Sequence, residues 1–404
     1  MNVAQPARPA TDTPRSAQRP LVVRCGALGD MVLLTPLLAL LHRRYGLAPD
    51  VLASGAWTPS LYAGHADVHD VLLLDSRRRP YWSDPRQWRL MRMLRAGGPR
   101  PVYVCDERAT APLAHLLRRA GFGDGDLLWV GQHPECAHTH WVDRWLAFGA
   151  LDAPRWPGAP AARVDAVPRL EAGAGPREDC ARWLAQRGWA GRPLLLLHPG
   201  NKRTLKRGGR RGRLGDSKAW PDAHWLALLQ AMLARTPQAL ILLTGTPPEQ
   251  PWLLRLARAS GSPRVHAVGN DLPLPRLLAL QARATGMACV DTGPAHCAAA
   301  LGCPLLVLYG AASAAAWLPR SPTGSPVLWR GGADAGRGRL LDTAPGEAIA
   351  AWNTLPLCWP GGAPRRRTRA AARPARIRPS LDSTAPLPAR LERRTRALPP
   401  PSSS

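Results

Sequence analysis

Two successive stretches of the sequence alternate short β-type runs with longer helical segments, and this pattern constrains the fold most. The first group of runs contains Leu21–Val23, Asp50–Leu52, Val71–Leu74, Val102–Val104 and Leu127–Val130. The second group contains Leu194–Leu197, Ala239–Leu243, Val265–Val268, Met287–Val290 and Leu305–Leu308. Such alternation is typical of parallel α/β domains. We therefore predict an α/β protein with two Rossmann-like domains facing a central cleft.

Composition shifts along the chain predict the domain boundaries. Prolines, glycines and alanines interrupt the α/β pattern between the two groups, which indicates a linker. The pattern fades after about Gly331, and the arginine-rich end cannot bury enough apolar surface to fold. The predicted organisation is a disordered N-terminus (1–20), a first Rossmann-like domain (21–149), a linker (150–175), a second Rossmann-like domain (176–330), a poorly defined segment (331–360) and a disordered arginine-rich tail (361–404).

The charge of the chain is strongly positive, with 54 Lys and Arg against 28 Asp and Glu and a formal net charge of +26. A field of that sign favours phosphorylated substrates, anionic membrane surfaces or nucleic acid as partners. A nucleic-acid-binding protein is a distant alternative, because the sequence has no zinc finger and no RNP-type aromatic motif. The basic tail is either a solvated compositional leftover or a contact with a membrane or nucleic acid.

The cysteines and the apolar runs exclude several classes of protein. Eight cysteines are too sparse for a disulfide scaffold and lack the paired C-x-x-C spacing of a structural zinc site. We expect reduced, mostly buried thiols and no metal. The segment Met1–Pro20 lacks the apolar core of a signal peptide, and the longest apolar run, Met31–Leu41, is far shorter than the roughly 20 residues that a bilayer requires. We expect a cytoplasmic protein.

The first candidate site is Arg24–Asp30, which follows a β-type run and opens a predicted helix over Met31–Tyr45. The glycines Gly26 and Gly29 would let a ligand approach the backbone, and a helix N-terminus presents free N–H groups. The G-x-x-G spacing differs from the G-x-G-x-x-G dinucleotide fingerprint. Asp30 stands at the start of the predicted helix, so it is either a helix cap or a general base at the mouth of the cleft.

The second candidate site combines His198-Pro199-Gly200 with Lys218, which lies in Lys218-Ala219-Trp220-Pro221. A strand followed by a glycine turn and a basic residue suits a diphosphate, because amides and an ammonium can share its charge. Lys218 is either such a ligand or a solvated lysine. Glu249, in G-T-P-P-E after another β-type run, either takes the hydroxyls of a ribose or complements the dipole of a first helical turn.

The third candidate site is Asp291–His296, placed where a β-type run ends and a helix begins. The hydroxyl of Thr292, the flexible Gly293, helix N-terminal amides and His296 converge within this short segment. Those groups suit the phosphate of a nucleotide sugar. The alternative is a capped helix with a hydrogen-bonded histidine.

Taken in order, the motifs resemble glycosyltransferase family 9, the ADP-heptose:lipopolysaccharide heptosyltransferases. They are R-x-G-A-L-G-D, H-P-G, K-x-W-P, G-T-P-x-E, and D-T-G-P-x-H followed by A-A-x-L-G-x-P, and they cover about Leu21–Gly310. The resemblance implies a GT-B fold in which the first domain binds the acceptor and the second binds the donor. It also implies inversion at the anomeric carbon and independence from a bound metal or other cofactor. The nucleotide sugar, ADP-heptose, would be a substrate, and a lipopolysaccharide core or another lipid-linked surface glycan would be the acceptor.

The resemblance also implies roles for individual residues. Asp30 matches the proposed catalytic base, which would deprotonate the acceptor hydroxyl, with Gly26 and Gly29 in the acceptor-side loop. The remaining matched residues would bind the donor. They are Lys218 for the diphosphate, Thr292, Gly293 and His296 for the phosphate loop with Asp291 supporting it, and Glu249 for the ribose.

Two features depart from the family pattern. A basic insertion, Asn201–Ser217, separates H-P-G from the lysine, so Thr204 and Ser217 are only candidates for the hydroxyl contacts expected there. The C-terminal region lacks the closing helices that would run back over the first domain. A family member with another donor or acceptor, or an inactive homologue, is the alternative function. An acceptor of the expected kind would place the protein at the inner-membrane face, with contact to an anionic membrane as an option.

Overall fold

The computed structural model describes residues 18–76, 79–107, 111–160, 163–201 and 216–359. The predicted disordered tail, 361–404, lies outside these residues, as does the predicted disordered N-terminus except for residues 18–20. Thr204 and most of the basic insertion also lie outside them. Among the described residues, no helix is long and apolar enough to cross a membrane.

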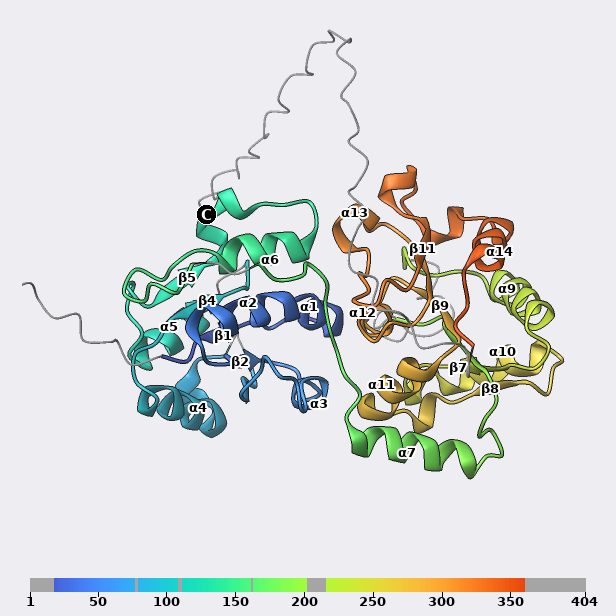
Figure 1. The fold of residues 1–404 in the computed structure, drawn as a ribbon, viewed down its shortest axis with the longest axis horizontal. Coiled ribbons are helices and arrows are strands. Elements are labelled where there is room, and N and C mark those ends of the chain that lie inside the picture. The colour runs from blue at the N-terminus through green and yellow to red at the C-terminus, as the bar shows by residue number, and fades with distance from the viewer. Residues whose placement is uncertain (1–17, 77–78, 108–110, 161–162, 202–215, 360–404) are drawn as a thin grey trace, which may run out of the picture. The chain divides into compact units, whose positions relative to one another are not determined.

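The N-terminal half of the chain forms a parallel five-stranded sheet in the order β3-β2-β1-β4-β5 (Figure 1). Its strands are β1 (Leu21–Val23), β2 (Asp50–Ala53), β3 (Val71–Leu73), β4 (Val102–Val104) and β5 (Leu127–Trp129). Val22 of the central strand pairs with Val51 on one side and Tyr103 on the other. The helices of this half are α1 (Leu28–Leu33), α2 (Thr35–Tyr45), α3 (Thr58–Leu61), α4 (Pro85–Ala96), α5 (Ala111–Arg119) and α6 (Trp141–Gly149).

The C-terminal half forms a parallel six-stranded sheet in the order β11-β10-β9-β6-β7-β8. Its strands are β6 (Leu194–His198), β7 (Leu240–Leu243), β8 (Val265–Ala267), β9 (Gly286–Val290), β10 (Leu305–Tyr309) and β11 (Val327–Gly331). The helices are α7 (Ala174–Ala185), α9 (Asp222–Arg235), α10 (Gln250–Ala259), α11 (Leu274–Arg283), α12 (Gly293–Ala300), α13 (Ala314–Trp317) and α14 (Pro345–Thr354). Short 3₁₀ turns occur at η1 (Tyr81–Ser83), η2 (Val130–Gln132), η3 (Pro134–Cys136), η4 (Pro247–Glu249), η5 (Gly269–Asp271), η6 (Ala333–Ala335) and η7 (Leu340–Asp342).

The central strands of both sheets are buried on their two faces, which explains why they are almost continuously apolar. Side chains alternate across a strand, so Leu21 and Val23 pack with α4 and α5 whereas Val22 packs with α1, α2 and α6. In the second sheet, Leu195 packs with α9, α10 and α14, and Leu196 packs on the other face with α7, α11 and α12. Each half therefore has the α/β sandwich that the alternating pattern predicts.

The structure corrects two expectations and confirms a third. The helix predicted over Met31–Tyr45 begins at Leu28 and is divided at Leu34, because Pro36 starts a second helix and cannot donate to the first. The segment after Gly331, which the sequence left poorly defined, folds into η6, η7 and α14, and Trp352 is fully buried. Six of the eight cysteines are buried, as expected.

The strand order places a topological switch point in each sheet. In the first sheet the order reverses between β1 and β4, and in the second between β6 and β9. Ligands of open α/β sheets bind outside the carboxyl ends of the strands at such points. The loops that follow these four strands are therefore where a site is expected.

Candidate functional site

A cavity of about 520 Å³ lies at these strand ends and is lined by both halves of the chain. The first half contributes the turn after β1, and the second half contributes the loops after β6, β9 and β10 together with the segment before α9. The lining residues are Ala27, Gly29, Asp30, Asn201, Ser217, Lys218, Asp291, Thr292, Gly293, His296, Ala311, Ala312 and Trp317. Seven of the nine predicted site residues are among them, and Gly26 and Glu249 are not.

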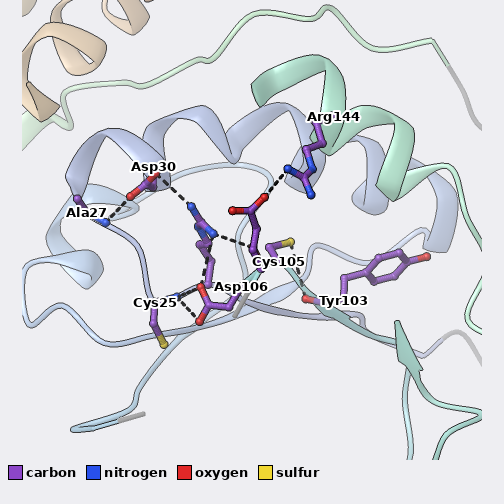
Figure 2. Close-up of polar contacts among 9 residues, drawn as sticks. Cys25, Ala27, Asp30, Tyr103, Cys105, Asp106 and Arg144 are labelled. Carbon is purple, nitrogen blue, oxygen red and sulfur yellow. Dashed lines mark hydrogen bonds and ion pairs between the residues drawn. The ribbon is translucent and has the colours of Figure 1, made fainter. Parts of the chain in front are cut away.

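Asp30 caps α1 from within the helix and also faces the cavity. Its Oδ2 accepts a hydrogen bond from the backbone N–H of Ala27 at 2.7 Å, and its Oδ1 accepts one from Nη2 of Arg24 at 3.1 Å (Figure 2). The Asp30 side chain is 19% exposed. The carboxylate is thus fixed in direction by two donors while remaining accessible from the cavity.

Arg24 connects Asp30 to the end of the neighbouring strand β4. Its Nη1 donates to the carbonyl of Cys105 at 2.7 Å and lies 3.5 Å from the carboxylate of Asp106. Asp106 in turn accepts from the backbone N–H of Cys25 at 3.1 Å, so it braces the turn that leads to Asp30 (Figure 2). The Arg24 guanidinium also lies 5.2 Å from the ring centroid of Trp145, close enough for a cation–π contact.

The N-terminal ends of α1 and α12 approach each other closely at the cavity, and two glycines make this approach possible. A Cβ on Gly29 would lie 2.7 Å from the His296 ring, and a Cβ on Gly293 would lie 2.6 Å from Leu28. A side chain at either position would push the helices apart. Gly26 has a related role outside the cavity lining, since a Cβ there would lie 2.5 Å from the Cβ of Asp30.

Lys218 is held at the cavity by hydrogen bonds to Asp291 and by the anchored segment Ser217–Trp220 in which it lies. Its Nζ donates to Oδ2 of Asp291 at 2.6 Å and to the backbone carbonyl of Asp291 at 2.7 Å. The Lys218 side chain is 24% exposed, so the ammonium retains access to the cavity. The loop is anchored by Trp220, which is buried and donates to the carbonyl of Thr343 at 3.0 Å, and Ser217 accepts from the backbone of Leu340 at 2.7 Å.

The N-terminus of α12 opens into the cavity between Thr292 and His296. Thr292 is the N-cap residue, but its hydroxyl makes no capping hydrogen bond. The first N–H groups of a helix carry partial positive charge and bind anions. Among the described residues, Nδ1 of His296 is buried without a hydrogen-bond partner. Burial lowers the pKa of His296 to about 4, against the opposing charges of Asp291 and Asp30, so its imidazole is neutral at pH 7.

Glu249 lies beside the cavity rather than in its wall. Its Oε2 accepts from the backbone N–H and the hydroxyl of Thr246, each at 2.8 Å, which makes it a capping residue for η4. Its other oxygen packs against Gly200, where an added Cβ would lie 2.0 Å away. Burial raises the pKa of Glu249, and the Thr246 hydrogen bonds oppose this shift. In the described residues Oε1 has no partner, so the proposed ribose contact stays a prediction.

The buried histidines predict how stability depends on pH. Burial lowers the pKa of both His198 and His296 to about 4, whereas the unfolded chain protonates histidine below about pH 6.5. The free energy of unfolding should therefore be insensitive to these groups above pH 6.5 and fall as the pH drops from 6.5 toward 4. Urea unfolding at several pH values measures this slope. Replacing His198, whose Nδ1 pairs with Thr244, by glutamine should make the slope shallower; an unchanged slope would contradict the prediction.

Several residues of the site were not predicted from the sequence. The sequence places Arg24 in a motif without indicating its role, and it does not single out Asp106, although this residue directly follows a β-type run. Asn201 and Trp317 also line the cavity. Position directly after a strand could have indicated Asp106, whereas nothing local distinguishes Trp317. In the part of the chain that the structure describes, no His, Cys, Asp or Glu side chains group in a way that could hold a metal ion.

Comparison with known proteins relates this geometry to a family. Residues 176–328 match the family model of glycosyltransferase family 9 (heptosyltransferase). Lipopolysaccharide heptosyltransferase 3 of Escherichia coli is 31% identical over 104 residues, which are 26% of this chain and only 31% of that protein.

Solved structures extend the similarity to most of the fold. The structure of E. coli ADP-heptose lipopolysaccharide heptosyltransferase II matches with a TM-score of 0.61 and 19% identity, covering 83% of this chain and 98% of that one. E. coli heptosyltransferase WaaC, solved with ADP, matches with a TM-score of 0.58 and 19% identity, covering 82% and 98%. Residues 176–328 are therefore similar to a glycosyltransferase family 9 domain, and the chain has the GT-B fold of the solved heptosyltransferases.

Proposed function

We propose that this protein transfers a heptose from ADP-heptose to a hydroxyl of a lipopolysaccharide core or a related lipid-linked surface glycan. The observation that carries the proposal is the single cavity in which Asp30 from the first half lies with Lys218 and His296 from the second. A base and an anion-binding group on facing domains are what a displacement between two substrates needs. The first domain (21–149) would hold the acceptor and the second (176–330) the donor.

In the proposed reaction, Asp30 acts as the general base. Its carboxylate would take the proton of the acceptor hydroxyl as that oxygen forms a bond to the anomeric carbon of the donor sugar. Arg24 and the Ala27 amide keep the carboxylate oriented toward the cavity. Because the oxygen attacks from the side opposite the leaving group, a direct displacement inverts the configuration at that carbon.

The leaving group is the nucleoside diphosphate, and the second domain supplies positive charge where its negative charge develops. Lys218 would contact the diphosphate as an ammonium, and the first amides of α12 with the Thr292 hydroxyl would bind a phosphate oxygen. Neutral His296 can donate one hydrogen bond from its ring. Asp291 positions the lysine. We propose that this set of donors acts without a metal ion or other cofactor.

The proposed acceptor determines where the protein would work. A lipid-linked glycan under assembly would place the reaction at the cytoplasmic face of the inner membrane, with the protein peripheral to that surface. The basic tail, 361–404, is a candidate contact with anionic lipid because of its sequence alone. Another nucleotide sugar or another acceptor within the same chemistry is the main alternative.

Turnover with defined substrates tests the proposal. The purified full chain is incubated with ADP-heptose and a deacylated, water-soluble Kdo-type core acceptor, and both ADP release and the mass of the glycan are measured. We expect ADP release that depends on the acceptor and one added heptose. Turnover only with a different nucleotide sugar would replace the donor assignment. ADP binding without turnover on any acceptor would favour an inactive homologue, and salt-sensitive binding of DNA in place of ADP would favour the nucleic-acid alternative.

A further inference from the structure

Large apolar side chains are exposed together on one segment of the first half. Seven such side chains are exposed in the described residues, and three of them lie on η1 and α4: Trp82 at 67%, Trp88 at 47% and Met93 at 51%. Isolated exposed apolar residues are ordinary, but a group of them on one element marks a contact surface. The opposite side of α4 is committed to the core through Leu90, Met91 and Leu94, so the helix cannot rotate to bury the exposed group.

The same face of α4 is strongly cationic. Arg89, Arg92 and Arg95 are exposed, and none of them forms an ion pair with a carboxylate among the described residues. The guanidinium of Arg92 lies 5.1 Å from the ring centroid of Trp88. Arg86 is the exception, with a distant partner in Asp75 at 3.8 Å. We call the group Trp82, Trp88, Arg89, Arg92, Met93 and Arg95 the tryptophan–arginine face.

We propose that the tryptophan–arginine face docks this protein on an anionic phospholipid bilayer. Tryptophan is favoured at the level of lipid headgroups, where its ring is partly apolar and its N–H remains hydrated. Amphipathic helices that lie on membranes combine such side chains with arginines that meet the negative surface. On α4, the arginines without carboxylate partners would contact the anionic headgroups, and the exposed apolar side chains would enter the interfacial region of the bilayer.

Two other partners fit the surface less well. Single-stranded nucleic acid is bound by aromatic side chains along a positively charged groove, whereas the exposed rings here lie on the outer side of a helix and on the turn before it. A second copy of the chain would bring the same arginines against each other unless acidic groups faced them. The preference for a bilayer also rests in part on the proposed function, because a lipid-linked acceptor would lie at such a surface.

The tryptophan–arginine face belongs to the domain that would hold the acceptor. A contact between this face and the bilayer would therefore bring that domain close to a lipid-linked acceptor. The segment with η1 follows β3, whose carboxyl end lies at the same edge of the sheet as the end of β1, where the turn to Asp30 begins. None of the six residues lines the cavity. Docking would therefore hold the acceptor domain near the lipid surface without touching the reacting groups.

The experiment uses the full chain, vesicles of phosphatidylglycerol and phosphatidylcholine, and a doxyl-labelled lipid that quenches nearby tryptophan. We expect the doxyl lipid to quench the tryptophan fluorescence of the wild-type protein. The control Trp359→Ser, which removes an exposed tryptophan elsewhere, should be quenched to the same extent. The double variant Trp82→Ser/Trp88→Ser should lose most of this quenching. Arg89→Gln/Arg92→Gln should weaken vesicle partitioning about tenfold at low salt. The matched control Arg255→Gln/Arg258→Gln removes two exposed arginines from α10 and should change it little.

The basic tail is the same in every variant, so a difference between the α4 variants and their controls reports vesicle binding by the tryptophan–arginine face alone. Equal quenching and equal partitioning of the α4 variants and their controls would overturn the proposal. Tight binding of an oligonucleotide that only Arg89→Gln/Arg92→Gln abolishes would make the face a nucleic-acid surface, and a dimer that only Trp82→Ser/Trp88→Ser dissociates would make it an interface between copies. Turnover on the lipid-free acceptor should be unchanged in all variants. Vesicle docking without any turnover would contradict the proposed function and leave the docking surface standing.

Discussion

Replacing Asp30 by asparagine should lower kcat for sugar transfer by about 10² to 10⁴, the range typical for loss of a positioned general base. An amide cannot accept the proton of the acceptor hydroxyl at any pH of interest. It can still accept the hydrogen bond from the Ala27 amide, so the turn and α1 should persist. The affinity for ADP should change little, because the contacts of Asp30 are to Arg24 and Ala27 of its own domain. Initial rates and calorimetric ADP titration measure the two quantities.

A second helix-capping aspartate provides the matched control for this prediction. Asp84 is the N-cap of α4, and its Oδ1 accepts from the backbone N–H of Arg86 at 2.9 Å, yet it lies outside the cavity. If Asp30 were only a cap, Asp30→Asn and Asp84→Asn would each lower the free energy of unfolding slightly and leave turnover within a few-fold of wild type. A large turnover loss confined to Asp30→Asn would assign the carboxylate to the chemistry.

Most strands of this protein could be predicted closely because they are short and apolar, and the central strands are buried on both faces. Each predicted β-type run contains or overlaps an observed strand, from Leu21–Val23 to Leu305–Tyr309. The candidate motifs follow from the same rule, since they stand directly after β1, β6, β7 and β9. Parallel strands end at one edge of a sheet, so polar residues placed there meet at a common site. The sequence pattern therefore indicated most of the cavity wall.

The order of strands is not visible in the sequence, and this explains the residues that were missed. The bracing of the Asp30 turn by Asp106 depends on β1 and β4 being neighbours, although about eighty residues separate them. Trp317 reaches the cavity because the chain turns back after β10, which no local pattern specifies. Glu249 shows that one motif can serve two purposes, because T-x-x-E is also the signature of a capping box and Oε2 makes those capping contacts, while the ribose contact of Glu249 stays a prediction.

Two elements at the end of the second domain were also not predicted. The strand β11, Val327–Gly331, has the sequence V-L-W-R-G and is only partly buried at four of its five residues, and it was not predicted. Helix α14 follows it and is short, yet Ala348, Ala351 and Trp352 pack fully into the core of the second domain. Tertiary burial stabilises such short helices more than intrinsic propensity does. Their existence could be seen only once the sheet that they cover was in place.

Replacing Lys218 by alanine should lower kcat/KM for the nucleotide sugar by about 10² to 10³, comparable to the loss of one preorganised donor to a developing anion. Among the described residues that line the cavity, Lys218 is the one cationic side chain, so its removal leaves amides, hydroxyls and neutral His296 there to meet the departing diphosphate. The affinity for ADP, measured by calorimetry, should fall as well. The variant also leaves Asp291, whose side chain is 10% exposed, without the partner that lies 2.6 Å away, which should lower the free energy of unfolding.

The ion pair between Lys218 and Asp291 allows two roles of the lysine to be distinguished: binding the diphosphate, and neutralising the buried carboxylate of Asp291. In Lys218→Ala/Asp291→Asn the uncompensated carboxylate is gone, so stability should recover relative to Lys218→Ala alone. If the lysine binds the diphosphate, turnover and ADP affinity of the double variant stay low despite the restored stability. If the lysine serves only to neutralise Asp291, activity recovers together with stability, and the donor site would have to be placed elsewhere. Lys218→Arg keeps the charge in a different shape, so it should retain more ADP affinity than Lys218→Ala while losing rate through misplacement of the cation.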